Sequence, residues 1–300
     1  MLRRMALSSL LPIDSLVLTT RWGGKAALVS NLINRALAHR RIGDRLGYFL
    51  VSEYPKSGGT WFGKMAAEAI QLPYPEHSVL PIGCPAVIHN HWTFHRGFRR
   101  AWYVCRDGRD VMVSLYFHRT RFLAKPDTPV GRSARAMLEK VLGRDFDPAD
   151  SRGNMLAFIR HEFANPRQSF RANWRDHVMG WLGDGTPHPH VHVVKYESLL
   201  EDAAGTLGKA IEWACGRPAS EWVVSQTVEK HSMARQTGRK PGSEDRGNFI
   251  RKGVAGDWVN HFTTETAAEF DRLAGDALVA LGYETDRSWM DRFDPTAARA

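Results

Sequence analysis

The feature that most constrains the fold of this chain is a short apolar strand that runs into a glycine turn and then into a helix. Residues Tyr48–Ser52 form an apolar run of the kind that becomes a buried strand. The turn that follows contains Gly58 and Gly59, and apolar residues then recur at helical spacing from about Thr60 to Ile70. This order of elements predicts the first unit of a parallel α/β sheet.

The rest of the chain repeats the alternation of strand and helix. Further strands are predicted at Ala86–His89, Trp102–Cys105 and Val191–Lys195. The predicted helices are Asp110–His118 with Asp110 as N-cap, Ala134–Leu142, Asn154–Phe163, Phe170–Trp181, Ser198–Cys215 and Glu265–Leu281. The expected fold class is therefore α/β, a P-loop-like parallel β-sheet flanked by helices on both faces, with ligands beyond the carboxyl ends of the strands.

Three segments depart from this alternation. Residues 1–45 read as a basic, amphipathic arm, which we expect to pack on the main domain (46–290); a peripheral contact with a membrane surface is the alternative. Residues 121–153 are predicted as a mobile excursion over a site or as a plain surface insertion. The polar stretch Ser232–Asn248 is predicted as a loop, and residues 291–300 as a C-terminal tail.

Charge and cysteine usage narrow the class of partner. The chain has 41 Lys and Arg against 32 Asp and Glu, a formal net charge of +9, which favours an anionic partner. The cations are dispersed apart from local clusters, so a nucleic-acid partner is not expected. The three cysteines have no metal-ligand or C-x-x-C spacing, which indicates reduced thiols and a cytoplasmic location.

The turn after the first strand has the chemistry of an anion cradle. It reads Tyr54-Pro55-Lys56-Ser57-Gly58-Gly59-Thr60-Trp61. Two glycines let the backbone curl around an anion, the helix N-terminus offers unpaired N–H groups, and Lys56 adds a full charge. The lysine precedes the glycines, so the turn is not a Walker A loop, which counts against a P-loop kinase-like phosphotransferase, the alternative function. A plain glycine turn is the structural alternative.

This turn resembles the phosphosulfate-binding loop of the sulfotransferase family, whose pattern is Pro-Lys-Ser-Gly-Thr-Thr-Trp. The chain has Gly59 where the family usually has threonine. The resemblance implies transfer of a sulfuryl group from 3′-phosphoadenosine 5′-phosphosulfate (PAPS) to an acceptor hydroxyl or amine. It also implies that the donor is held by Lys56, Ser57, Gly58, Gly59, Thr60 and Trp61.

Two further segments resemble the same family. After the third strand, Arg106 and Ser114 have the spacing of the arginine and serine that bind the 3′-phosphate of the nucleotide. Near the C-terminus, Phe249-Ile250-Arg251-Lys252-Gly253 resembles the family's Arg-Lys-Gly segment, which closes over that phosphate. The resemblance further places Tyr196, Ser232 and Met233 near the adenine, with Met233 where the family has an aromatic residue.

Sulfuryl transfer requires a base for the acceptor proton and a cation for the leaving phosphate oxygen. Lys56, in the cradle, suits the second role. The family places its catalytic histidine just after a strand, which maps to His91, with His89 where lysine usually stands. The short distance in sequence to Arg106 keeps both His91 and His89 as candidates, with His95 as a third. No metal is expected, because Lys56 and the helix dipole supply the charge.

The acceptor is the least constrained part of the prediction. A small molecule, a glycan or a lipid headgroup all fit a sulfuryl-transfer site. A third class of function is a basic binding module without catalysis. Such a module would have clustered cations and exposed aromatic residues, whereas the cations of this chain are dispersed apart from local clusters.

Overall fold

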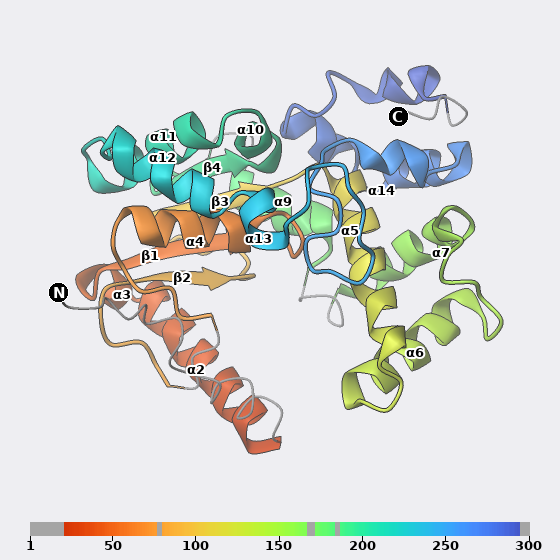
Figure 1. The fold of residues 1–300 in the computed structure, drawn as a ribbon, viewed down its shortest axis with the longest axis horizontal. Coiled ribbons are helices and arrows are strands. Elements are labelled where there is room, and N and C mark those ends of the chain that lie inside the picture. Colours follow the sequence, from red (N-terminus) through yellow and green to blue (C-terminus); the bar gives the residue numbers. More distant parts are fainter. Residues whose placement is uncertain (1–20, 77–79, 167–171, 184–186, 295–300) are drawn as a thin grey trace.

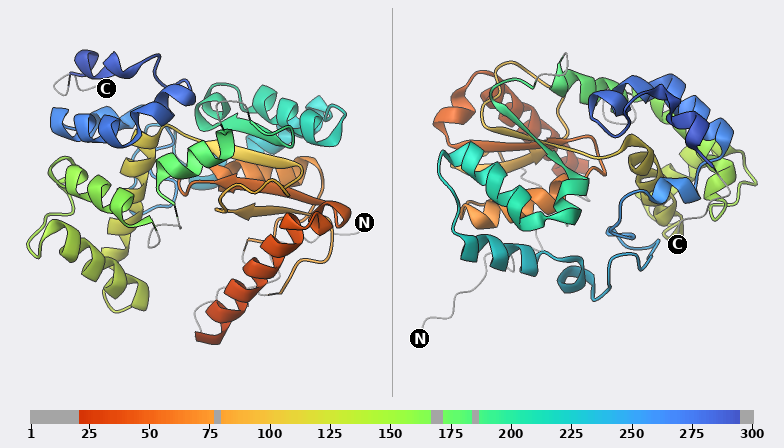
Figure 2. Two further views of the ribbon diagram at one scale, coloured as in Figure 1. Left: turned by 180° about the vertical axis from the view of Figure 1, so that it is seen from behind. Right: turned by 90° about the horizontal axis from the view of Figure 1, so that it is seen from above.

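The computed structural model describes residues 21–76, 80–166, 172–183 and 187–294. Its centre is a parallel sheet with the strand order β2-β1-β3-β4 (Figure 1). The strands are β1 (Tyr48–Glu53), β2 (Ala86–Asn90), β3 (Ala101–Cys105) and β4 (Val191–Lys195). Figure 2 shows helices on both sides of this sheet, which confirms the predicted fold class.

The pairing of β1 with both β2 and β3 brings the carboxyl ends of three strands to one edge of the sheet. Ser52 lies opposite Asn90 of β2, and Glu53 lies opposite Val104 of β3. The carboxyl end of β1 is therefore flanked by the ends of two neighbouring strands. This is the edge at which ligands of parallel sheets bind.

The two faces of the sheet are buried in separate cores, because successive side chains of a strand point to opposite faces. Phe49 and Val51 belong to the core formed with α4, α11 and α12. Leu50 and Tyr103 belong to the larger core on the other face. The helices of the first face are α4 (Gly59–Ala69), α11 (Ala203–Cys215) and α12 (Glu221–Lys230). Those contributing to the second are α5 (Gly108–Thr120), α7 (Ser151–Ala164), α9 (Trp174–Leu182) and α14 (Thr264–Ala280).

The prediction that Asp110 caps α5 is wrong. The helix begins at Gly108, and the carboxylate of Asp107 accepts a hydrogen bond from the backbone N–H of Arg109 at 2.9 Å. Asp110 is buried, and its carboxylate accepts instead from the backbone N–H groups of Gly256 and Trp258, at 2.7 and 2.9 Å. Asp110 therefore fixes the C-terminal loop onto α5.

The helical content after β4 is higher than predicted. The single helix predicted at Ser198–Cys215 is two helices, α10 (Tyr196–Glu201) and α11, because Asp202 ends the first and caps the second through the N–H of Gly205. The segment predicted as a loop at Ser232–Asn248 contains α13 (Met233–Thr237). Helix α12 was not predicted, since few of its residues are buried.

Residues 121–153 form more regular structure than one short helical patch. A 3₁₀ turn at Arg121–Ala124 leads into α6 (Pro129–Leu142), which Thr128 caps. Leu138 of α6 is fully buried, and α6 packs against α5 and α7, beside the sheet (Figure 1). Helix α9 begins at Trp174 rather than at the predicted Phe170, and residues 167–171 lie outside the described part of the chain.

The predicted N-terminal arm contains α2 (Arg21–His39) and α3 (Ile42–Arg45). Asn31 of α2 accepts a hydrogen bond from Trp92 Nε1 at 3.0 Å, and Asn34 accepts from the backbone N–H of Ile82 at 2.9 Å. Residues 1–20 lie outside the described part of the chain. None of the helices in the described ranges is both long enough and apolar enough to cross a membrane.

The C-terminal end of the described chain packs on the domain. Trp289 is buried and contacts Trp258 edge to face, with ring centroids 5.8 Å apart. Phe293, within the predicted tail, lies 5.1 Å from Trp258 by the same measure. Residues 295–300 are outside the described ranges.

Candidate functional site

The donor loop, residues 54–60, connects β1 to α4 through two residues in the left-handed backbone region. Lys56 has a φ of 75° and Gly58 a φ of 99°. A Cβ atom at Gly58 would lie 2.5 Å from Cδ2 of Tyr196. Position 58 therefore requires glycine for both its backbone angle and the close approach of the tyrosine ring. The loop ends at the N-terminus of α4, where backbone N–H groups point outward.

A cavity of about 320 Å³, which we call the nucleotide cavity, is lined in part by this loop. All but two of the residues predicted to bind the donor line it; the exceptions are Ser57 and Gly59. The lining includes Lys56, Gly58, Thr60, Trp61, Arg106, Ser114, Tyr196, Ser232, Met233, Phe249, Arg251, Lys252 and Gly253. Residues that lie as far apart in the sequence as Lys56 and Gly253 therefore line the same cavity.

Aromatic rings form one wall of this nucleotide cavity. Trp61 and Tyr196 meet edge to face, with ring centroids 6.0 Å apart, and Trp61 Nε1 donates a hydrogen bond to the backbone oxygen of His231. Met233 lies against Gly253, where a Cβ atom would be 2.5 Å from the Met233 sulfur. Ser232 caps α13, so its hydroxyl accepts from the N–H of Arg235.

Arg106 lies at the centre of the cavity wall. Its guanidinium donates to the backbone oxygens of Val254 at 3.0 Å and Lys56 at 3.4 Å, and lies 4.5 Å above the ring of Tyr196. Among the described residues, neither Arg106 Nε nor the buried hydroxyl of Ser57 has a hydrogen-bond partner. Unpaired buried donors of this kind fit an anionic ligand, because leaving them unpaired is unfavourable.

Arg251 and Lys252 approach the cavity from the C-terminal loop. Asp257 holds both: its carboxylate accepts from Arg251 at 2.5 Å and from Lys252 at 2.6 Å. Burial would raise the pKa of Asp257, but the hydrogen bonds from His261, Lys252 and Arg251 hold that pKa far below its usual range. The two cations are therefore fixed before any ligand binds.

A second cavity, of about 720 Å³, is also lined by residues of the donor loop. It shares Glu53, Lys56, Thr60 and Phe249 with the nucleotide cavity. Its other lining residues include His89, His91, Asn31, Arg35, Lys64 and Glu76. Two cavities that meet at the cradle suit a reaction that moves a group from one bound molecule to another.

Lys56 lies at the junction of the two cavities. Its ammonium group is 3.8 Å from the centre of the Phe249 ring. Burial, followed by the charge of Arg121, lowers the pKa of Lys56 to about 7. An added anion at the junction would favour the charged form of Lys56.

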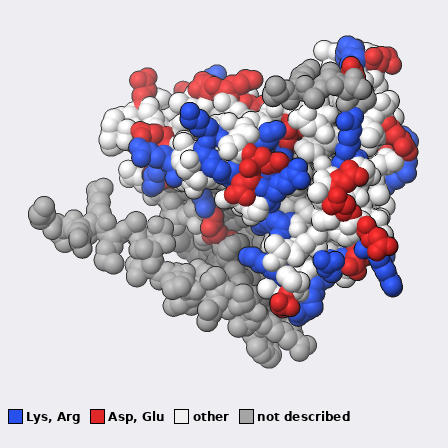
Figure 3. Space-filling model, turned by 45° about the vertical axis from the view of Figure 1, so that its right-hand side comes forward, with Lys and Arg blue, Asp and Glu red and all other residues white. Residues whose placement is uncertain are grey.

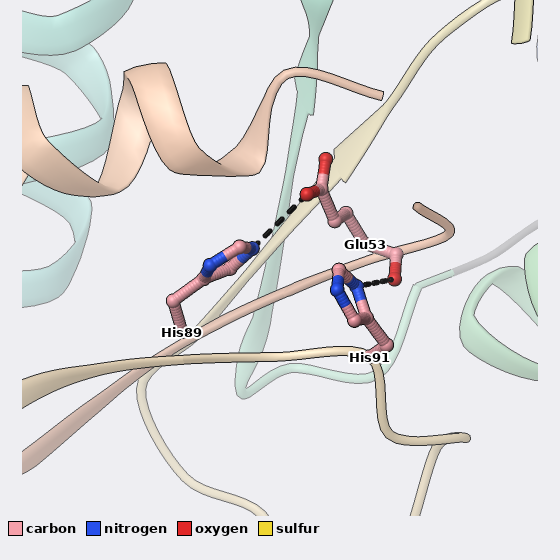
Figure 4. Close-up of side chains that lie close together, drawn as sticks. All are labelled: Glu53, His89 and His91. Atoms are coloured by element: carbon pink, nitrogen blue, oxygen red, sulfur yellow. Dashed lines mark hydrogen bonds and ion pairs between the residues drawn. The ribbon is translucent and has the colours of Figure 1, made fainter. Parts of the chain in front are cut away.

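His89 and His91 contact different atoms of Glu53 (Figure 4). His91 Nδ1 lies 3.2 Å from the backbone oxygen of Glu53, and His89 Nε2 lies 3.0 Å from the Glu53 carboxylate. A backbone oxygen only accepts, so the His91 contact places a proton on Nδ1 and leaves Nε2 as the basic nitrogen. Burial lowers the pKa of His91, which favours the neutral ring that a base needs.

His95 has a local structural role. Its ring stacks on His39 with a centroid distance of 3.8 Å, and its Nδ1 accepts a hydrogen bond from the N–H of Gly97. The third histidine candidate thus contacts α2 and its own turn.

Sequence reasoning missed Glu53, the last residue of β1. Its side chain is buried, and its carboxylate accepts from the N–H of Gly59 at 2.5 Å as well as contacting His89. Burial would raise the pKa of Glu53, but the hydrogen bond and charge of His89 hold that pKa below its usual value. The available signal was a carboxylate directly before the cradle, together with glycine at 59 in place of threonine.

Glu53, His89 and His91 are also of types that bind metal ions, with ligand atoms within 4.8 Å of one another. No metal is expected from the sequence, in which Glu53 does not stand out as a candidate ligand. In the structure, one ring nitrogen of each histidine is already hydrogen-bonded to Glu53. We therefore treat the three residues as a hydrogen-bonded group.

A family model described as a sulfotransferase domain matches residues 99–282. Mouse Sulfotransferase 2B1 is 25% identical over 262 residues, which is 75% of this chain and 69% of that protein. Sulfotransferase 1E1 of Cavia porcellus is 25% identical over 266 residues, which is 74% of this chain and 80% of that protein.

Solved structures show the same fold. Mouse sulfotransferase SULT7A1 complexed with PAP superposes with a TM-score of 0.55 at 17% identity, over 86% of this chain and 96% of that one. Retinol dehydratase in a complex with retinol and PAP gives a TM-score of 0.55 at 16% identity, over 82% and 86%. The chain belongs to the sulfotransferase family, and it transfers a sulfuryl group from PAPS to an acceptor.

Proposed function

We propose that the two cavities hold the donor and the acceptor, and that the residues at their junction carry out an in-line sulfuryl transfer. The single observation that carries this proposal is the shared lining at Lys56, with the nucleotide cavity on one side and His91 on the other. A sulfuryl group bound at the donor loop would face an acceptor in the larger cavity. Transfer of this kind depends chiefly on positioning and on charge stabilisation.

His91 is the proposed base. The proton on its Nδ1 is directed to the Glu53 backbone oxygen, so Nε2 can take the proton of the acceptor hydroxyl or amine. The acceptor oxygen or nitrogen then bonds to sulfur as the bond from sulfur to the phosphate oxygen breaks. The products are the sulfated acceptor and adenosine 3′,5′-bisphosphate (PAP).

Lys56 is proposed to neutralise the charge that develops on the leaving phosphate oxygen. It is a point charge on a flexible side chain, so it can leave the Phe249 ring and follow that charge. With Lys56 and the N-terminus of α4 in this role, the reaction needs no metal. We therefore propose that the enzyme is independent of metal ions.

The remaining nucleotide contacts follow from the cavity. Arg106, Ser114, Arg251, Lys252 and Gly253 would hold the 3′-phosphate; the unpaired Arg106 Nε and the fixed Arg251 support this. Ser57, Gly58, Gly59 and Thr60 would hold the phosphosulfate. Trp61, Tyr196, Ser232 and Met233 would surround the adenine, and Phe249 would lie near the phosphosulfate, beside Lys56.

The acceptor is proposed to be a hydroxyl- or amine-bearing small molecule, a glycan or a lipid headgroup. Charged side chains in the larger cavity, among them Arg35, Lys64 and Glu76, favour an acceptor with several polar groups. A nucleic-acid partner is not proposed, because basic and acidic side chains are interspersed on the face drawn in Figure 3. We also propose a cytoplasmic enzyme whose N-terminal arm contacts membrane surfaces when the acceptor is a lipid.

The test is transfer of radioactive sulfate from ³⁵S-labelled PAPS, with EDTA present, to panels of phenols, sterols, sugars and lipid headgroups. The proposal expects a labelled product in at least one panel, and its loss in His91→Ala. Transfer that survives in His91→Ala but not in His89→Ala would assign the base to His89. Transfer abolished by EDTA and restored by a divalent metal would refute the metal-independent mechanism.

A further inference from the structure

The buried carboxylate of Glu53 joins the donor side of the site to the acceptor side. One of its oxygens accepts from the N–H of Gly59 at 2.5 Å, and the other lies 3.0 Å from His89 Nε2 (Figure 4). The backbone oxygen of the same residue contacts His91 Nδ1. One residue therefore touches the first residue of α4 and both histidines.

The space that this carboxylate occupies explains the glycine at 59. A Cβ atom at Gly59 would lie 2.6 Å from Cδ of Glu53 and 3.0 Å from Cγ and Oε1. Gly59 is not among the residues with positive φ, so its backbone would accept an alanine. The obstacle to a side chain at 59 is the Glu53 carboxylate.

Gly58 differs from Gly59 in both respects. Its φ of 99° disfavours other residues, and a Cβ atom there would meet the ring of Tyr196 rather than Glu53. Glycine is therefore required at positions 58 and 59 for different structural reasons. Substitution of Gly58 can serve as a matched control for substitution of Gly59.

We propose that Glu53 is a positioning residue for sulfuryl transfer, which fixes both histidines relative to the donor loop and for which glycine at position 59 is the required partner. The inference rests on the proposed function, since it assigns His91 as the base. Glu53 lines both cavities, but no step of the transfer is assigned to its carboxylate. It acts through the Gly59 N–H and through the two rings.

The charges around the group are consistent with this role. Burial lowers the pKa of His91, and the negative charge of Glu53 partly offsets that effect. The groups that face this cluster are Lys56 from the donor loop, Tyr74, His89 from β2, and His177 from α9, whose Nε2 lies 3.4 Å from the His91 backbone oxygen. A carboxylate beside a histidine ring orients that ring, as in hydrolase triads; here the carboxylate lies beside His89, and the backbone oxygen of Glu53 lies beside His91.

The first test is a double-mutant cycle in which calorimetry measures the affinity for PAP. Gly59→Ala alone should weaken PAP binding by about 5–150-fold, because the added methyl displaces the Glu53 side chain and the start of α4. In the Glu53→Ala background the same change should weaken binding by less than about threefold. Gly58→Ala should lose affinity equally in both backgrounds.

Equal losses from Gly59→Ala with and without Glu53 would overturn the proposed pairing. A wild-type protein that fails to bind PAP would refute the proposed function itself, so the two failures are distinguishable.

The second test does not need Gly59→Ala to fold. It follows the histidine ring signals by NMR against pH in the wild type, in Glu53→Gln and in Glu139→Gln, a control with the same chemical change on the surface of α6. Removing the negative charge should lower the pKa of His91, so its signal should titrate at a lower pH in Glu53→Gln and be unchanged in the control. An identical His91 titration in all three proteins would show that Glu53 does not act on the base.

Discussion

Replacing Arg106 with alanine is expected to lower both the affinity for the donor nucleotide and the free energy of unfolding. The guanidinium donates to Val254 O at 3.0 Å and to Lys56 O at 3.4 Å, and lies 3.7 Å from the Asp110 carboxylate. Hydrogen bonds from charged donors contribute about 1.5–3 kcal/mol each, and the longer contact contributes less, so we expect a loss of about 2–4 kcal/mol in the free energy of unfolding. Asp110 keeps its two backbone donors, which limits this loss.

The effect on the ligand adds to this structural cost. In the bound state, Arg106 would donate two charge-assisted hydrogen bonds to the 3′-phosphate. Losing them should cost about 3–6 kcal/mol of binding free energy, which is a factor of about 10²–10⁴ in Kd for PAP.

Calorimetry with PAP and thermal unfolding of the same samples separate the two effects. Arg272→Ala, which removes an exposed arginine on α14, is the control for net charge and should leave PAP affinity within about twofold. Arg106→Lys should retain part of the affinity for PAP, because lysine keeps the positive charge but cannot form the bidentate hydrogen bonds of a guanidinium. An Arg106→Ala protein that is folded and binds PAP as tightly as the wild type would refute the phosphate role.

Three further predictions follow from the junction of the cavities. Lys56→Met should lower turnover by about 10²–10³-fold with a smaller change in PAP affinity, as steady-state kinetics with the screened acceptor would show; near-normal turnover would remove its role in charge stabilisation. His91→Ala should lower turnover by about 10²–10⁴-fold and exceed the loss in His89→Ala; the reverse order would assign the base to His89. Because the pKa of Lys56 is about 7 in the free protein and an anion favours its charged form, PAP affinity should fall as pH rises from 7 to 9. The fall should be absent in Lys56→Met, and an equal fall in both proteins would exclude Lys56 as its source.

The parts of the site that could be predicted from the sequence are those encoded within one continuous segment. The donor loop combines strand, glycines and helix start in about a dozen residues. Arg106 and Ser114 likewise lie on one strand end and one helix. Their roles were predicted from the resemblance of this segment to the family's 3′-phosphate motif, and both residues line the nucleotide cavity.

The parts that were missed depend on contacts between distant segments. Glu53 gains its position from His89, which lies on a neighbouring strand, and its burial is a property of the assembled sheet. Asp110 looked like a helix cap because its local sequence suits one, but Gly256 and Trp258 draw its carboxylate into a tertiary contact. Local sequence contains neither partner.

Helix α12 shows a different limit of pattern reading. Val224 and Thr227 are its buried residues, so the apolar periodicity that identifies a buried helix is weak. Its position comes from packing against α4 and α11. Tertiary contact, rather than amphipathic pattern, therefore accounts for this helix.

Calorimetric titration with PAP and, separately, with ATP distinguishes a PAPS-dependent enzyme from an ATP-dependent one, with EDTA in one series and magnesium in the other. We expect tight, metal-independent binding of PAP and weak binding of ATP, because Arg106 and Arg251 would hold a 3′-phosphate that ATP lacks. Magnesium-dependent binding of ATP without binding of PAP would contradict PAPS-dependent transfer and would favour a kinase-like phosphotransferase.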